Sequence, residues 1–238
     1  MTQFLFRDDS YLPSVEATVT AVSEDGGIVL DRTVFYAASG GQPGDSGEIR
    51  RADGGVIAIA TAIHPEGDKT RIVHVPAERQ ATVVVGETVT VAIDWERRYR
   101  LMRMHTALHL LSVVFPFPVT GGSVGDDKGR LDFDMPAMPE ELGALEEALN
   151  VMVAADHAVT AEWITDAEMA ANPELIKTMN VKPPMGQGRV RLIRIGDVDL
   201  QPCGGTHVRR TGEIGRLRLG KIEKKGKQNR RVGLLFAE

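Results

Sequence analysis

Two short motifs, far apart in the sequence, must meet in space if they serve one chemistry, and they constrain the fold more than any other feature. The first motif, RLMRMHTALHLL at 100–111, sets His105 and His109 four residues apart inside an apolar pattern of helical period. The apolar residues recur three or four positions apart, at Leu101, Met104, Leu108, Leu111 and Phe115. The two histidines follow the neighbouring stripe, so we expect both imidazoles to lie on one helix face beside the buried one.

The second motif is PCGGTHV at 202–208, where Cys203, the only cysteine, stands four residues before His207. Three imidazole nitrogens and one thiolate sulfur make a donor set that suits tetrahedral zinc. The two glycines between the ligands should let the backbone turn tightly. Alone, the histidine pair would more often be hydrogen-bonded core residues, and Cys203 a small buried hydrophobe. Together the motifs predict one zinc ion per chain, bound by His105, His109, Cys203 and His207.

Length and composition leave room for two domains of ordinary size. The chain has 238 residues, of which 42% are hydrophobic, enough for real cores. No window is apolar enough for a membrane span, and the start MTQFLFRDDS lacks the features of a signal peptide. A single cysteine cannot form an internal disulfide, which agrees with a reducing compartment. We therefore expect a cytoplasmic protein without membrane contact, and no obligate protein partner is evident.

The residues up to Asp94 read as short strands separated by turns. Apolar and polar residues alternate in VEATVTAV, and IVL, GGVIAIATAI, RIVHV and VVVGETVTVAID follow, with glycine or proline near their ends. This pattern predicts a small antiparallel β-barrel or sandwich over residues 1–94, and the barrel is the architecture that we expect. The loop SGGQPGDSG at 39–47 lacks the lysine and the following helix of a phosphate-binding P-loop. It is either a pair of turns or a segment that faces a substrate.

Residues 95–238 are expected to form a second domain that begins with the histidine helix. Asp94 is a suitable N-cap for this helix, and Phe115-Pro116 should end it, because proline cannot continue the hydrogen-bond ladder. GRLDFDM, AVTAEWI and RVRLIRI read as strands, whereas residues 139–155 and a short stretch before Pro173 read as helices. The domain should therefore be α+β, with helices packed on a mainly antiparallel sheet.

Basic residues are concentrated in one stretch, although the formal net charge of the chain is −5. Residues 209–231 contain ten Arg or Lys against two Glu, a local charge of +8. Four more arginines lie shortly before His105: Arg97, Arg98, Arg100 and Arg103. Such blocks are usually solvated surface, but two of them bracketing one metal site favour an anionic partner such as a nucleic-acid backbone. The expected phosphate contacts include Lys224, Lys225 and Lys227.

The residue between the histidines bears on the chemistry of the site. A zinc helix that hydrolyses peptides carries a glutamate directly after its first histidine, and this chain has Thr106 there. Four protein ligands would also suit a structural zinc, whereas a catalytic zinc usually keeps one position for water. The residues thus leave two alternatives: an enzyme acting on an activated ester, and a non-catalytic RNA-binding module whose zinc ties two segments together.

The motifs HTALHLL and CGGTH, the segment FYAASGGQPGDSG and the ending TGEIGRLRLGKIEKKGKQNRRVGL closely resemble the stand-alone alanyl-tRNA editing proteins of the AlaX type. That family is related to the editing domain of alanyl-tRNA synthetase, and the resemblance covers nearly the whole chain. The FYAASGGQPGD segment is typical of the longer form, in which a barrel precedes the zinc domain. The resemblance implies a zinc-dependent aminoacyl-tRNA deacylase that removes serine, and also glycine, from the acceptor stem of mischarged tRNA(Ala).

The resemblance also implies roles for particular residues. The zinc ligands would be His105, His109, Cys203 and His207. The stretch VTGGSVG after the helix resembles the turn where related proteins contact the amino acid, so Thr120 and Ser123 become candidates for contacting the serine hydroxyl. A glycine motif linked with the choice of tRNA corresponds to Gly40, Gly41 and Gln42. One departure is Ala37, where the family usually has proline.

Overall fold

The computed structural model describes residues 2–66, 68–78, 83–179 and 188–237. The chain divides into two compact units, Met1–Tyr99 and Arg100–Glu238, and the division falls inside helix α1 (Trp95–Val114). Asp94 caps this helix as the sequence predicts, since its carboxylate accepts a hydrogen bond from the Arg97 backbone N–H at 3.1 Å. Among the described residues, no helix combines the length and the apolar character needed to cross a membrane.

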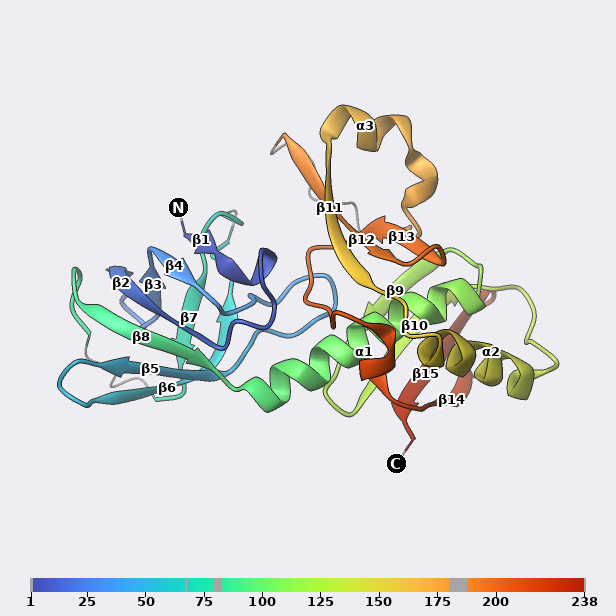
Figure 1. The fold of residues 1–238 in the computed structure, drawn as a ribbon, viewed down its shortest axis with the longest axis horizontal. Helices are drawn as coiled ribbons and strands as arrows, with labels where there is room; N and C mark the ends of the chain where they lie inside the picture. The colour runs from blue at the N-terminus through green and yellow to red at the C-terminus, as the bar shows by residue number, and fades with distance from the viewer. Residues whose placement is uncertain (1, 67, 79–82, 180–187, 238) are drawn as a thin grey trace. The chain divides into compact units, whose positions relative to one another are not determined.

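The first unit is a closed antiparallel barrel whose strands follow the order β2-β3-β7-β6-β5-β8 (Figure 1). These strands are β2 (Ser14–Val22), β3 (Ile28–Leu30), β5 (Gly47–Arg51), β6 (Val56–Ile63), β7 (Val73–Pro76) and β8 (Thr88–Ile93). Two short strands pair in parallel beside it: β1 (Gln3–Phe4) and β4 (Arg32–Thr33). A 3₁₀ turn, η1 (Leu5–Arg7), follows β1. The predicted barrel is confirmed.

Alternation along the strands fills the interior of the barrel. In β8, for example, Val89, Val91 and Ile93 are buried, whereas Thr88 and Thr90 are exposed. The buried valines and Ile93 join Ile28 and Ile49 in one continuous apolar core. The alternation of apolar and polar residues in the sequence therefore places the apolar side chains inside the barrel and the polar side chains outside it.

His74 on β7 is a fully buried polar group of this core. Its Nδ1 lies 2.9 Å from the Ile28 carbonyl oxygen, and its Nε2 lies 2.8 Å from the Thr33 hydroxyl. The carbonyl can only accept, so the neutral ring donates from Nδ1 and accepts at Nε2. Burial lowers the pKa of His74 from 6.5 to about 4, more than its hydrogen bond to Ile28 raises it.

The barrel is expected to lose stability as the pH falls from about 6.5 to about 4. Within this window the unfolded chain binds a proton at His74 and the folded barrel does not, so acid favours unfolding. A shift of this size corresponds to about 3 kcal/mol. Hydrogen exchange of β3 and β7 amides at pH 7 and at pH 4.5 measures the change. His74→Gln is the matched control, and an equal pH dependence in both proteins would contradict the role of His74.

The second unit contains two sheets. The four-stranded sheet has the order β14-β15-β10-β9, and the three-stranded sheet the order β11-β12-β13 (Figure 1). Their strands are β9 (Val119–Ser123), β10 (Lys128–Asp134), β11 (Val159–Thr165), β12 (Arg189–Ile195), β13 (Asp199–Pro202), β14 (Leu217–Lys224) and β15 (Asn229–Phe236). The helices and 3₁₀ turns are the later part of α1, α2 (Leu142–Ala154), α3 (Asp166–Ala171), η2 (Pro173–Leu175) and η3 (Thr211–Ile214). All strand pairs within both sheets are antiparallel, so the α+β prediction is confirmed.

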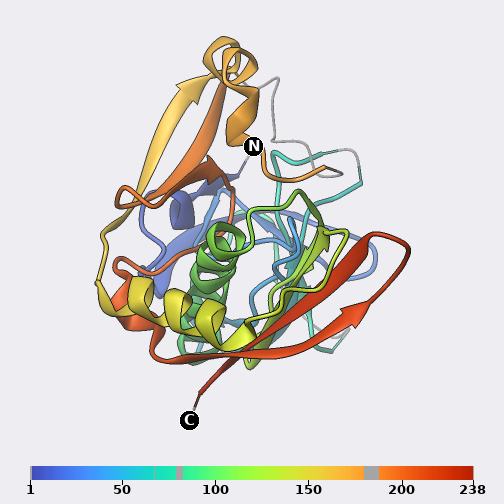
Figure 2. The same ribbon diagram turned by 90° about the vertical axis from the view of Figure 1, so that its right-hand side faces the viewer.

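Helices α1 and α2 lie on the same side of the four-stranded sheet (Figure 2). α1 approaches β10 so closely that a Cβ added to Gly129 would lie 2.8 Å from the Met104 side chain. α2 contacts β14, where Asn150 donates to the Leu217 carbonyl and accepts from the Leu217 N–H. The apolar stripe of α1 is buried on this sheet, which fixes the face that its histidines occupy.

Two boundaries differ from the sequence prediction. α2 begins at Leu142, three residues after Pro139, so the proline lies before the helix. The stretch around Gly121 and Gly122, expected as a turn, forms strand β9, which pairs with β10. A Cβ on Gly122 would lie 2.9 Å from the Leu131 side chain, so glycine here permits close approach between strands.

Candidate metal centre

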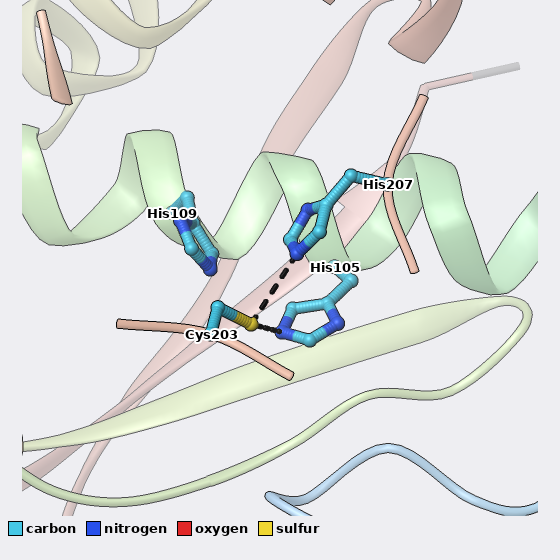
Figure 3. A group of neighbouring side chains, drawn as sticks. All are labelled: His105, His109, Cys203 and His207. Carbon is cyan, nitrogen blue, oxygen red and sulfur yellow. Dashed lines mark hydrogen bonds between the residues drawn. The ribbon is translucent and has the colours of Figure 1, made fainter. Parts of the chain in front are cut away.

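The structure brings together the four residues that the two motifs supply. His105 and His109 project from α1, and Cys203 and His207 lie in the loop after β13 (Figure 3). One donor atom of each residue lies within 4.8 Å of the other three, and the four side chains point toward a common centre (Figure 3). Three of the residues are buried and Cys203 is half-buried.

The distances within the cluster fit a metal ion. Cys203 Sγ lies 3.5 Å from His105 Nε2 and 3.3 Å from His207 Nε2. Around tetrahedral zinc, ordinary Zn–N and Zn–S bonds place neighbouring donors about 3.3 to 3.6 Å apart. The fold thus sets these donors at nearly the spacing that zinc requires. We conclude that the cluster is consistent with a metal ion and that its donor chemistry matches zinc.

The surroundings of Cys203 and His207 favour the protonation states that bind metal. Burial is the largest single influence on the Cys203 thiol and raises its pKa, but the neighbouring imidazoles of His105, His207 and His109 together outweigh it and hold the pKa well below its ordinary value. Burial and the charge of His105 lower the pKa of His207 to about 3. A thiolate and a neutral imidazole are therefore preferred at neutral pH, and these are the forms that coordinate metals.

Thr106 fixes the orientation of His207 from inside α1. Its hydroxyl lies 2.9 Å from the Met102 carbonyl, to which it donates, and 3.1 Å from His207 Nδ1. Because the hydroxyl proton is already used, Nδ1 must carry the proton of the ring and donate it to Thr106. This leaves Nε2 unprotonated and directed at Cys203. The residue that stands where a metalloprotease has its glutamate thus supports a ligand.

His109 has a charged partner in place of a hydroxyl. Its Nδ1 lies 3.2 Å from Asp199 Oδ2 on β13. Burial lowers the pKa of His109, but Asp199 and Cys203 outweigh this effect and raise it to about 9. Without an ion both ring nitrogens are therefore protonated at neutral pH, and a metal would displace the proton on Nε2 while Nδ1 stays with Asp199.

Arg191 on β12 holds the loop that carries Cys203 and His207. Its guanidinium donates to the carbonyls of Cys203 and Gly205 at 3.1 and 2.9 Å, and its own carbonyl accepts from the Cys203 N–H. Neither Gly204 nor Gly205 has a positive φ, and a Cβ on Gly204 would meet nothing within 4 Å. The expectation that this turn depends on glycine flexibility is therefore wrong for Gly204, since hydrogen bonds from Arg191 shape the loop.

Sequence reasoning missed Asp199, Arg191 and the supporting role of Thr106. A signal for Asp199 existed, because residues two apart in a strand share a face. Asp199 and Gln201 on β13 lie four and two residues before Cys203. No comparable pattern marks Arg191.

The two residues expected at the serine hydroxyl lie on β9. Thr120 is half-buried, and its hydroxyl donates to the Asp132 carbonyl and accepts from the Asn229 amide, both at 3.1 Å. Ser123 is also half-buried and lies opposite Arg130 on β10. β9 is linked toward the metal cluster through Lys177, whose carbonyl accepts from the Val119 N–H.

The glycine motif belongs to the first unit, where it forms a tight hairpin. Gly40 and Gly41 have φ values of 55° and 84°, and Ser39 and Gln42 exchange two backbone hydrogen bonds across them. A two-residue turn in which both φ values are positive strongly favours glycine at both positions. The two glycines are exposed, whereas Gln42 is only 2% exposed.

A buried ion pair anchors the segment that carries this hairpin. Arg98 and Asp45 are both fully enclosed and paired, and Asp45 also accepts from the Tyr36 N–H at 2.6 Å. Arg98 was grouped in the sequence with arginines that could meet an anionic partner. That interpretation is wrong for Arg98, because its charge is used inside the first unit.

The basic stretch after His207 is only partly available at the surface. Arg231 pairs with Asp132, Arg210 pairs with Asp156, and Arg230 is buried. The lysines around the β14–β15 turn are exposed: Lys224, Lys225 and Lys227. Lys225 also contacts Glu223 at 2.6 Å.

Comparison with known families agrees with this geometry. Residues 190–232, which include Cys203 and His207, match the model described as the threonyl and alanyl tRNA synthetase second additional domain. Residues 8–97 match the model described as tRNA synthetases class II (A). Together with the fold and the site, these matches define the class: proteins related to the additional domain of threonyl- and alanyl-tRNA synthetases.

Full-length relatives narrow the class to a family. The chain is 37% identical to the alanyl-tRNA editing protein AlaX-M of Methanosarcina mazei, over 98% of this chain and 95% of the relative. It is 31% identical to AlaX-L of Pyrococcus horikoshii over 98% of this chain but 57% of the relative, so its length fits the M form. It is also 34% identical to the alanine–tRNA ligase of Pyrobaculum calidifontis, over 94% of this chain and 25% of the relative. The chain belongs to the AlaX-type alanyl-tRNA editing proteins, which are aminoacyl-tRNA deacylases.

Proposed function

We propose that this protein hydrolyses, in trans, the ester bond that joins a wrong amino acid to tRNA(Ala), with serine as the main substrate and glycine as a second. Membership of the family implies editing of mischarged tRNA(Ala) and hence tRNA binding. The observation that carries the proposal is the convergence of His105, His109, Cys203 and His207 at one centre within such a chain. We propose that these four residues bind one zinc ion.

The donor set sets limits on the chemistry. Bound zinc supplies a Lewis acid that can polarise a carbonyl or lower the pKa of water toward about 7. The chain itself fixes two of the imidazoles, through Thr106 and Asp199, and holds the ligand loop through Arg191. It has no glutamate after His105 to act as a base, which favours an ester over the less reactive amide.

We propose that β9 reads the serine side chain through Thr120 or Ser123. Both residues follow α1 directly in the chain, and β9 is joined to the segment of Lys177, whose ammonium group lies 2.5 Å from Asp199 Oδ1. The Thr120 hydroxyl already donates to Asp132 and accepts from Asn229, so it can contact a substrate hydroxyl only by accepting one further hydrogen bond. Ser123 is the alternative reader on the same strand.

We propose further that tRNA contacts the exposed lysines of the β14–β15 turn and the exposed hairpin of Gly40 and Gly41. The hairpin presents backbone without side chains, which suits close approach by a nucleic-acid strand. Gln42, the third member of this motif, would take part only by supporting the turn, because its side chain is buried. The lysines carry charge into solvent, as phosphate binding requires.

Replacing Lys224, Lys225 and Lys227 together by alanine should make tRNA binding less dependent on salt. Each phosphate contact contributes about 0.7 to 0.9 to the slope of log affinity against log salt, so loss of three should flatten it by about 2 to 3. Titration of labelled tRNA(Ala) at several salt concentrations measures this slope. Replacement of the same lysines by arginine is the matched control, because it keeps the charge. If the alanine variant keeps the wild-type slope, tRNA binds elsewhere.

Release of serine from Ser-tRNA(Ala) tests the function itself. The enzyme should free serine catalytically and leave intact tRNA. A non-catalytic tRNA-binding module with a structural zinc would bind the same substrate, but serine would be released no faster than by spontaneous hydrolysis. A filter assay with radiolabelled serine separates these outcomes.

A further inference from the structure

A buried polar network lies behind His109, on the side of Nδ1. Asp199 is its centre: Oδ2 lies 3.2 Å from His109 Nδ1 and 2.8 Å from Gln201 Nε2, and Oδ1 lies 2.5 Å from Lys177 Nζ. The Asp199 side chain is 0% exposed, whereas that of Lys177 is 27% exposed. The Ser112 hydroxyl completes the network, 3.3 Å from both Lys177 Nζ and Gln201 Nε2.

Stability alone does not account for a carboxylate in this place. Removing a carboxylate from water costs several kcal/mol, and an apolar residue of similar size often serves stability equally well. Here both oxygens are occupied by donors, so the carboxylate cannot rotate without breaking a contact. Such a fixed acceptor suits one task in particular, which is to hold the ring of His109 in a single orientation and tautomer.

We propose that Asp199 is a positioning residue for the metal, which directs His109 Nε2 at the ion while Gln201 and Lys177 hold the carboxylate in place. A histidine ligand commonly donates its second N–H to a carboxylate, which orients the ring and makes the coordinating nitrogen a stronger donor. Strand β13 thus supplies both the support and, one residue past its end, the ligand Cys203. This inference rests on the metal proposed above.

The two histidines with known Nδ1 partners are supported differently. His207 donates to the neutral hydroxyl of Thr106, and His109 donates to an anion. The negative charge of Asp199 therefore lies directly against His109, in a carboxylate that Lys177 holds from its other oxygen. Removal of the charge should weaken metal binding even if the ring keeps its place.

The test is the zinc affinity of the metal-free full-length protein, measured by competition with a chromophoric chelator. Asp199→Ala should raise the zinc Kd by about tenfold to a hundredfold, the usual effect of losing such a partner. Asp199→Asn should cause a smaller loss, because its amide oxygen can still accept from His109. Asp132→Asn is the matched control: it removes a carboxylate paired with two arginines in the same unit and should leave the zinc Kd unchanged.

Lys177 provides a second and sharper measurement. In Asp199→Asn, the amide that satisfies His109 and Gln201 turns its NH₂ toward the Lys177 ammonium, so two donors face each other. Lys177→Met should therefore tighten zinc binding in the Asp199→Asn background and weaken it in the wild type. A residue that served only to fill space would not produce this change of sign.

The outcomes are distinct even if Asp199→Ala does not fold, because the asparagine variant keeps the shape of the side chain. Wild-type zinc affinity in both Asp199 variants would overturn the positioning role and leave the metal site standing. The same would follow if Lys177→Met changed affinity in the same direction in both backgrounds. A wild-type protein that binds no zinc would overturn the metal and this inference together.

Discussion

Cys203→Ala is expected to lose most of its zinc and its deacylase activity. A structural zinc contributes roughly 10–16 kcal/mol in total, so one of four ligands accounts for about 3 kcal/mol, or on the order of a hundredfold in affinity. Cys203 is also the sole anionic donor among the four, and it lies within 3.5 Å of both His105 and His207. Without the thiolate, the three imidazoles lose the charge that balances the ion.

Metal content and activity of the same preparations measure this effect. Elemental analysis should find close to one zinc per wild-type chain and far less in Cys203→Ala, with a lower melting temperature for the second unit. His157→Gln is the matched control, since His157 is in the same unit and outside the four-residue cluster. Equal zinc content in wild type and Cys203→Ala would show that Cys203 is not a ligand.

The metal cluster could be predicted because its chemistry is carried by residue types that are rare and regularly spaced. Two histidines at helical spacing define one half of the site, and the only cysteine with a histidine four residues later defines the other. The helix itself follows from its apolar period and from Asp94. Tertiary structure brings the two halves together. The four donor types suggest that the halves meet at one ion, but no local sequence pattern predicts this contact.

The supports of the site could not be predicted in the same way. Asp199 and Lys177 have ordinary spacing, and only the fold places them against His109. Arg98 was assigned to the surface because other arginines surround it in the sequence. In the structure it is buried and paired with Asp45, which lies 53 residues away in the chain. Strand β9 was read as a turn because glycine is common in turns, yet pairing with β10 outweighs that local preference.

Selectivity is the second large effect that we expect: Ser-tRNA(Ala) should be deacylated about ten- to a hundredfold faster than Ala-tRNA(Ala), and Gly-tRNA(Ala) less readily than Ser-tRNA(Ala). Serine exceeds alanine by one hydroxyl, so exclusion by size cannot spare alanine. The site must hold a polar group that needs the serine hydroxyl, because a desolvated group left unpaired costs about 1 to 3 kcal/mol.

The two candidates on β9 can be separated by conservative substitutions. Thr120→Val removes the hydroxyl that contacts Asp132 and Asn229, and so affects both selectivity and the strand. Thr120→Ser keeps the hydroxyl and serves as its control, while Ser123→Ala tests the other candidate. Single-turnover rates on Ser-tRNA(Ala) and Ala-tRNA(Ala) give the ratio for each variant.

The pattern of these ratios identifies the reader. If Thr120 reads serine, Thr120→Val lowers the ratio toward one while Thr120→Ser retains it; if Ser123 does, only Ser123→Ala lowers it. Equal wild-type rates on both substrates would remove the basis for a polar contact altogether. Full selectivity in Thr120→Val and Ser123→Ala alike would place the contact off β9, and the serine hydroxyl would then have to meet the metal centre itself or a water bound there.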